Sequence, residues 1–99
     1  MYEIRFSQGA LQDIKKLRAY DRKWILSEIE EKLSQQPMKL TRSQKPLKGL
    51  VPPFEAIVPS WGLRVGDYRV FYELDKDTKT VYVRAIRRKP PHRTTEGIL

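Results

Sequence analysis

Hydrophobic residues recur along the chain with two periods, and the change of period separates a helical part from a sheet part. Residues 2–6 alternate apolar and polar side chains, which is typical of a short strand. Ser7 is suited to cap a following helix, and Asp21 to cap a second one. The apolar stripes of these helices are Ala10, Leu11, Ile14 and Leu17, then Trp24, Ile25, Ile29 and Leu33. The pattern predicts an αα-hairpin, joined at residues 19–21 and ended before Pro37.

The second half of the chain follows the two-residue period of strands. Residues 37–53 contain several prolines and basic residues but no acid, which indicates a basic loop. Strands are predicted at residues 54–58, 61–65, 68–74 and 81–88, with turns at Gly66-Asp67 and at residues 75–79. The predicted fold class is therefore α+β in one domain of residues 1–99. An N-terminal strand and a two-helix hairpin precede a mainly antiparallel sheet of about four strands, with the helices on one face.

The same period sorts the side chains of the predicted sheet. Val70 and Tyr72 point to one face, while Arg69 and Phe71 point to the other. Arg64 likewise projects away from its apolar neighbours. If the helices cover the apolar face, Arg64 and Arg69 emerge together on the uncovered side, and Phe71 is an exposed aromatic suited to stacking on a base. The alternative is that the arginines only solvate this face or pair with Glu73 and Asp67.

Charge narrows the classes of partner. The 99 residues carry 20 Lys and Arg against 12 Asp and Glu, a net charge of +8. The segment from Arg84 to Arg93 is basic and has no acid, which makes Arg87, Arg88 and Arg93 candidate phosphate contacts. The alternative is that a small basic protein is simply soluble.

The amino acids that are rare or absent in the chain argue against several kinds of site. The chain has no Cys and one His, which argues against disulfides, thiolate catalysis and a metal site, and no cofactor is predicted. No apolar run has membrane-spanning length and the N-terminus lacks a signal-type stretch, so we expect a cytoplasmic protein without a membrane partner.

Three segments together resemble the RelE/ParE superfamily of bacterial toxins. They are Leu47-Lys-Gly49, residues 61–72 reading WGLRVGDYRVFY, and residues 81–89. The resemblance implies a RelE-like fold and a toxin of a type II toxin–antitoxin system in a bacterial or archaeal cytoplasm, with a cognate antitoxin as partner. RelE-like members cleave mRNA in the ribosomal A site, whereas ParE-like members poison DNA gyrase.

The resemblance also assigns residues by position. Lys48, Arg64, Arg69 and Lys89 fall where RelE-like enzymes have basic residues of their active site. The terminal aromatic of those enzymes has no clear counterpart here, and Gly62 stands where they have a further lysine. These two departures favour the ParE-like alternative.

Metal-independent RNA cleavage has three requirements, and basic residues of this chain are suited to meet them. The 2′-hydroxyl must lose a proton, the phosphorane must be stabilised, and the leaving 5′-oxygen must gain a proton. Guanidinium groups of Arg64 and Arg69, with Arg87 or Lys89, suit the second task. His92 is the candidate acid or base, and Lys48 or Lys89 could act as base only with a depressed pKa.

The favoured interpretation is a metal-independent mRNA endoribonuclease that acts on translating ribosomes and is neutralised by its antitoxin. Its partners would be mRNA in the A site and ribosomal RNA. A gyrase poison without ribonuclease activity is the alternative, and a non-catalytic RNA-binding module is the third hypothesis. The converging basic residues favour the enzyme.

Overall fold

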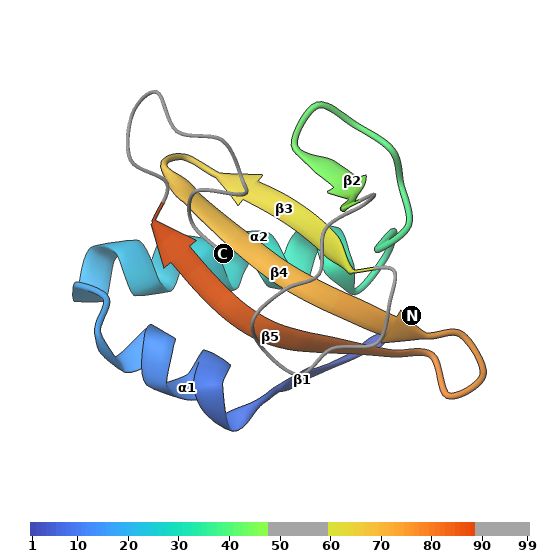
Figure 1. The fold of residues 1–99 in the computed structure, drawn as a ribbon, viewed down its shortest axis with the longest axis horizontal. Coiled ribbons are helices and arrows are strands. Elements are labelled where there is room, and N and C mark those ends of the chain that lie inside the picture. Colours follow the sequence, from blue (N-terminus) through green and yellow to red (C-terminus); the bar gives the residue numbers. More distant parts are fainter. Residues whose placement is uncertain (48–59, 89–99) are drawn as a thin grey trace.

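The computed structural model describes residues 1–47 and 60–88, which form one sheet and two helices (Figure 1). The chain begins with strand β1 (Glu3–Phe6), helix α1 (Gln8–Lys15) and helix α2 (Ala19–Leu33). Four strands follow, namely β2 (Gln44–Pro46), β3 (Trp61–Val65), β4 (Tyr68–Asp75) and β5 (Thr80–Arg88). The predicted α+β class and the order of its elements are confirmed.

The sheet contains five strands in the order β1-β5-β4-β3-β2. The strands β2 to β5 pair antiparallel with their neighbours, and β1 pairs parallel with β5 at one edge. The strand that the pattern missed is β2, which lies inside the predicted basic loop. Its three residues are too few and too polar to show an alternation. The strand predicted at residues 54–58 lies outside the described residues.

The core lies between α2 and one face of the sheet, and Figure 1 shows α2 behind the strands. Ile25, Ile29 and Leu33 are the buried side chains of the helix. They belong to one apolar cluster with sheet residues that include Leu63, Val70, Tyr72, Val81, Val83 and Ile86. The period of two therefore assigned the strand faces of β3 and β4 correctly, because Leu63, Val65, Val70 and Tyr72 all belong to this cluster.

The helix boundaries confirm one predicted cap and correct the other. Ser7 is the N-cap of α1, since its Oγ accepts a hydrogen bond of 3.1 Å from the Ala10 amide. The second helix instead begins at Ala19 with Arg18 as its N-cap, so residues 19–21 belong to the helix and do not link the pair. Asp21 lies in the first turn, where a carboxylate is favoured by the helix dipole, and accepts a hydrogen bond from the Tyr68 hydroxyl.

A β-bulge interrupts the pairing of β4 with β5. Phe71 is paired with Ala85 and Tyr72 with Val83, so Arg84 is the extra residue. The insertion changes the alternation along β5, because Val83 and Ile86 both face the core although three residues separate them. Arg84, Ala85 and Arg87 consequently lie toward the face opposite α2.

The turn between β3 and β4 depends on a glycine. Gly66 has a φ of 58°, and a Cβ built there would lie 2.5 Å from Cη2 of Trp24. Both the left-handed backbone and the close approach of the indole therefore require the absence of a side chain.

We expect Gly66→Ala to lower the free energy of unfolding by about 1–3 kcal/mol because it adds backbone strain and a steric clash. Urea denaturation followed by circular dichroism measures the change. Gly9→Ala is the matched control, since Gly9 lies in α1 and its new Cβ would have ordinary contacts, with 3.6 Å to the nearest atom. That variant should be about 0.5–1 kcal/mol more stable. Equal stability of the Gly66 variant and the parent protein would contradict this role of the glycine.

Candidate functional site

Three arginines lie side by side on the three middle strands of the sheet, close to the turn that joins β3 and β4. Arg64 of β3 is paired in register with Arg69 of β4, and Arg69 is paired with Arg87 of β5. Neighbouring strands are about 4.8 Å apart, and residues directly opposite each other project to the same face. Leu63, Val70 and Ile86 face the core, so this arginine row of Arg64, Arg69 and Arg87 lies on the face opposite α2. The predicted convergence of Arg64 and Arg69 is confirmed by the register.

The central arginine of the row is buried. Arg69 is 6% exposed, and its Nε is buried without a hydrogen-bond partner in the part of the chain that the structure describes. Burial lowers the pKa of Arg69, and the charge of Arg64 lowers it further. An arginine in this setting stays protonated at neutral pH at a cost in desolvation, which the charge of a bound anion would offset.

Gly62 provides the space in which the Arg69 side chain lies. A Cβ at position 62 would be 3.2 Å from Cδ of Arg69 and 3.3 Å from its Nη1. A side chain at position 62 would therefore require the Arg69 side chain to shift by a few tenths of an ångström. Gly62, which the resemblance places where RelE-like enzymes have a further lysine, thus leaves room for the Arg69 side chain beside β3.

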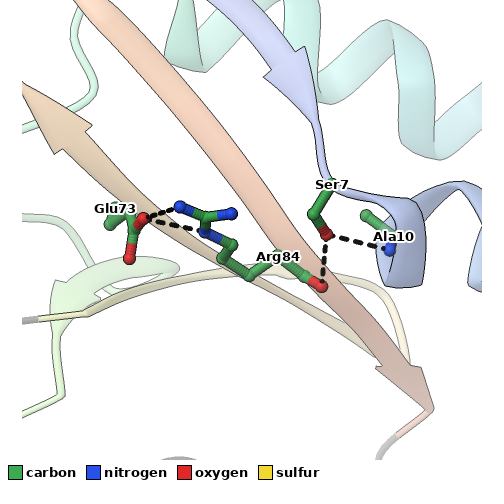
Figure 2. A network of polar contacts seen from close by, with 4 residues as sticks. All are labelled: Ser7, Ala10, Glu73 and Arg84. Carbon is green, nitrogen blue, oxygen red and sulfur yellow. Dashed lines mark hydrogen bonds and ion pairs between the residues drawn. The ribbon is translucent and has the colours of Figure 1, made fainter. Parts of the chain in front are cut away.

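A buried ion pair borders the row on the same face. Figure 2 shows Arg84, the bulge residue, directed at Glu73, whose side chain is 1% exposed. Nε of Arg84 donates to Oε1 of Glu73 over 2.7 Å, and Nη2 contacts the same oxygen. The Arg84 guanidinium also lies 5.2 Å from the ring centre of Tyr82. The Ser7 hydroxyl donates to the Arg84 carbonyl oxygen over 3.0 Å, which fixes the start of α1 to the bulge (Figure 2).

Arg87, the member of the row on β5, forms an ion pair with Asp13 of helix α1. Oδ2 of Asp13 accepts a hydrogen bond of 2.9 Å from the Ile86 amide and also contacts Nη1 of Arg87. This part of β5 extends beyond the end of β1, so its backbone amide bonds to a side chain of α1 in place of a strand. Asp13 therefore orients Arg87 and attaches α1 to the sheet. Of the row, Arg64 is the exposed member.

Comparison with known proteins decides the family. The family model described as ParE toxin of the type II toxin–antitoxin system, parDE, matches residues 4–89. The chain belongs to this toxin family. The predicted membership of the RelE/ParE superfamily is thereby confirmed. No curated protein was found to match the toxin.

Solved structures similar to the toxin come from bacteria and an archaeon. The RelBE2 toxin–antitoxin complex of Mycobacterium tuberculosis has a TM-score of 0.68 and 26% identity, and the match covers 89% of this chain and 98% of that one. The RelE–RelB complex of Pyrococcus horikoshii has a TM-score of 0.68 at 20% identity, covering 94% and 98%. The isolated E. coli RelE toxin has a TM-score of 0.69 at 17% identity, covering 98% and 92%. The last two establish the shared fold.

The prediction that Phe71 is an exposed aromatic is wrong, and its predicted contact with RNA stays a prediction. Its side chain has the expected parity, but it is 0% exposed and cannot stack on a base in this state of the toxin. Alternation assigns a residue to a face without telling how deeply that face is buried at each point. Its partners in register, Gly62 and Ala85, are both small and leave room for a large ring between the strands.

The remaining predicted residues divide into two groups. Arg88 is exposed and paired in register with Tyr68, which faces the helices, so it lies outside the arginine row. The predicted phosphate contacts Lys48 and Arg93 and the predicted catalytic residues Lys89 and His92 lie outside the described residues. Their assignment remains a prediction.

Sequence reasoning missed Asp13, and it named Glu73 as a possible partner of Arg64 or Arg69 when its partner is Arg84. Asp13 is one of several polar residues of its helix, and the periodic pattern does not distinguish it from the others. The Glu73–Arg84 pair depends on a bulge, and no glycine or other turn residue in the sequence indicates that bulge. The usable clue was the odd spacing of Val81, Val83 and Ile86 on one strand. Within residues 1–47 and 60–88 no three His, Cys, Asp or Glu residues gather as a metal site, and no helix could cross a membrane.

Proposed function

We propose that the toxin is a metal-independent endoribonuclease that cleaves mRNA on translating ribosomes and so inhibits translation. The observation that supports this most is the register of the arginine row, which aligns three arginines over three adjacent strands, with the guanidinium of Arg87 turned toward Asp13. Guanidinium groups grip phosphate oxygens through pairs of parallel hydrogen bonds. A row of this kind suits a phosphodiester whose negative charge increases in the transition state.

In the proposed reaction the 2′-hydroxyl oxygen attacks the adjacent phosphorus and its proton passes to a base. The bond from phosphorus to the 5′-oxygen breaks, and that oxygen takes up a proton. The products are a 2′,3′-cyclic phosphate and a 5′-hydroxyl end. Arg69 and Arg64 would stabilise the phosphorane oxygens. His92 is the proposed proton-transfer group, with Lys48 or Lys89 as the alternative base.

We further propose that a cognate antitoxin binds and neutralises the toxin. The structures from M. tuberculosis and P. horikoshii are complexes of toxin and antitoxin. The toxin has a net charge of +8, so an acidic segment of a partner would be attracted to it and would compete with RNA.

Controlled expression tests the proposed activity. We expect growth arrest and mRNA cuts that keep a fixed position within codons, mapped by primer extension, both suppressed by the open reading frame beside the toxin gene. Arg64→Gln should reduce the cuts strongly because Arg64 is the exposed member of the row. Arg42→Gln, an exposed arginine outside the row, should leave them unchanged. Growth arrest with intact mRNA would contradict the proposal.

The second candidate is a ParE-like poison of DNA gyrase without ribonuclease activity. It is favoured by the match to the ParE family and by the pairing of Arg87 with Asp13, which reduces the charge available to a phosphate. Accumulation of gyrase-cleaved DNA in the expressing cells, without mRNA cuts, would support it.

A further inference from the structure

A second basic site lies on the other side of the sheet edge from the arginine row. A groove of about 560 Å³ runs between the C-terminal end of α1, the link to α2 and the adjoining ends of β4 and β5. Its apolar walls are Leu17, Tyr68 and Ile86. Arg64 and Arg69 lie on the opposite face of the sheet, and Arg87 is the member of the row that also lines the groove.

The charged residues of the groove are mostly cations. Lys16, Arg18 and Arg88 line it and are exposed, and none of them forms an ion pair with another of the described residues. Arg18 and Arg88 also act by charge on the Tyr68 hydroxyl, where both lower its pKa against the larger effect of burial, which raises it. Two cations from distant segments therefore lie near one point of the groove.

The helix ends around the groove do not cancel its positive charge. Arg22 donates to the carbonyl oxygens of Ile14 over 3.2 Å and of Leu17 over 3.0 Å, so the negative end of α1 is already neutralised from within the protein. The groove also adjoins the start of α2, because Arg18 is the N-cap of that helix and makes no side-chain cap there. The positive end of the second helix dipole therefore lies beside the three cations, and Asp21 in the first turn of α2 offsets part of it.

Arg87 connects the groove with the arginine row. Its Cα belongs to the row, as the partner of Arg69, while its guanidinium contacts Asp13 at the lip of the groove. Asp13 is the only acid that lines the groove among the described residues, and it is engaged by Arg87 and by the Ile86 amide. A chain of phosphates leaving the row over β5 would therefore meet cations without passing an unpaired acid.

We propose that this groove binds backbone phosphates of the same single-stranded RNA, next to the nucleotides held by the arginine row. The assignment of RNA as the ligand rests on the proposed function. Lys16, Arg18 and Arg88 contact the phosphates, and Arg87 lies between the two sites. A polyanion fits the groove better than an apolar partner segment, because three exposed cations line it beside its three apolar residues.

The test compares two variants with equal loss of charge. The groove variant is Lys16→Gln/Arg18→Gln/Arg88→Gln, and the control variant is Lys39→Gln/Arg42→Gln/Lys76→Gln, which removes three exposed cations outside the groove. Full-length toxins, released from their antitoxin complexes, are titrated into a labelled 2′-O-methyl RNA of about 12 nucleotides, which cannot undergo 2′-hydroxyl attack. Fluorescence anisotropy gives Kd at several salt concentrations.

The groove variant should bind this RNA about tenfold to a hundredfold more weakly than the control variant, at unchanged melting temperature. Each lost phosphate contact should lower the salt-dependence slope by about 0.7, so three lower it by about 2. Equal Kd and slope for the two variants would overturn the inference. Loss of affinity for the antitoxin with unchanged RNA binding would also overturn it.

The same proteins separate this inference from the proposed function. If the wild-type toxin cleaves mRNA and the groove variant binds RNA normally, the groove proposal fails and the nuclease proposal stands. If the wild-type toxin cleaves no mRNA but the groove variant alone loses RNA affinity, the groove is an RNA site and the nuclease proposal fails.

Discussion

Replacing Arg69 with methionine is expected to abolish most RNA cleavage and at the same time to stabilise the fold. Loss of one preorganised donor to a developing phosphorane charge lowers kcat by about 10²–10³-fold. The free energy of unfolding should rise, because the wild-type guanidinium is buried and its Nε has no hydrogen-bond partner among the described residues. Methionine fills a similar volume without the desolvation cost.

The sign follows from the pKa of Arg69, which burial lowers. A lower pKa in the folded state means that the charged form of the arginine is less favourable in the folded protein than in the unfolded chain. This cost is fully present at every pH below the folded pKa, including neutrality, and decreases only as the pH rises through that pKa. Arg69→Met should therefore raise the free energy of unfolding at pH 7 by about 1 kcal/mol, or the melting temperature by about 4–8 °C.

Thermal denaturation and single-turnover cleavage of the same preparations measure both effects. Arg42→Met is the matched control, because Arg42 is exposed and outside the row, and it should change neither quantity. A variant at position 69 that cleaves RNA at the wild-type rate would show that the row is not the phosphate site. A strongly destabilised variant would show that Arg69 is a structural residue.

The largest loss of stability is expected from Glu73→Leu, which should lower the free energy of unfolding by about 3 kcal/mol. The substitution leaves the Arg84 guanidinium, a side chain only 24% exposed, without the carboxylate that it contacts through two nitrogens. The removal of one buried partner is costly because the other charge stays behind. Urea denaturation should give a lower midpoint with an unchanged slope.

A double replacement distinguishes the ion pair from simple packing. Glu73→Leu/Arg84→Leu removes both charges and should recover most of the lost stability, giving a coupling energy of about 1–3 kcal/mol in a double-mutant cycle. Additive losses in the two single variants would mean that the carboxylate stabilises the sheet by another route. The pairing of Arg5 with Glu3 is the exposed control, and its cycle should give at most about 1 kcal/mol.

The sequence predicted the parts of the toxin that depend on local pattern. The two amphipathic helices, the cap at Ser7 and the turn at Gly66-Asp67 each follow from side chains a few residues apart. The shared face of Arg64 and Arg69 also followed, because a two-residue turn fixes the register of the strands that it joins.

The parts that depend on contacts distant in sequence were not predictable in this way. Arg69 and Phe71 were assigned to the correct face, yet both are buried, since alternation says nothing of what packs above a face. The bulge at Arg84 moved Arg87 into the row, and only the pairing of β4 with β5 reveals it. The start of α2 at Ala19 was missed because Asp21 resembles a cap but instead binds Tyr68.

The central claim is that the arginine row acts on a phosphodiester, and a reconstituted reaction tests it most directly. Purified toxin is added to ribosomes programmed with mRNA, in the presence of a magnesium level that keeps the ribosome intact, and the ends of the products are analysed. We expect cleavage that leaves 2′,3′-cyclic phosphate and 5′-hydroxyl ends, and a loss of about 10²-fold or more in rate for Arg69→Met. Intact mRNA with the wild-type toxin, together with trapping of gyrase on cleaved DNA in a parallel reaction, would contradict the claim.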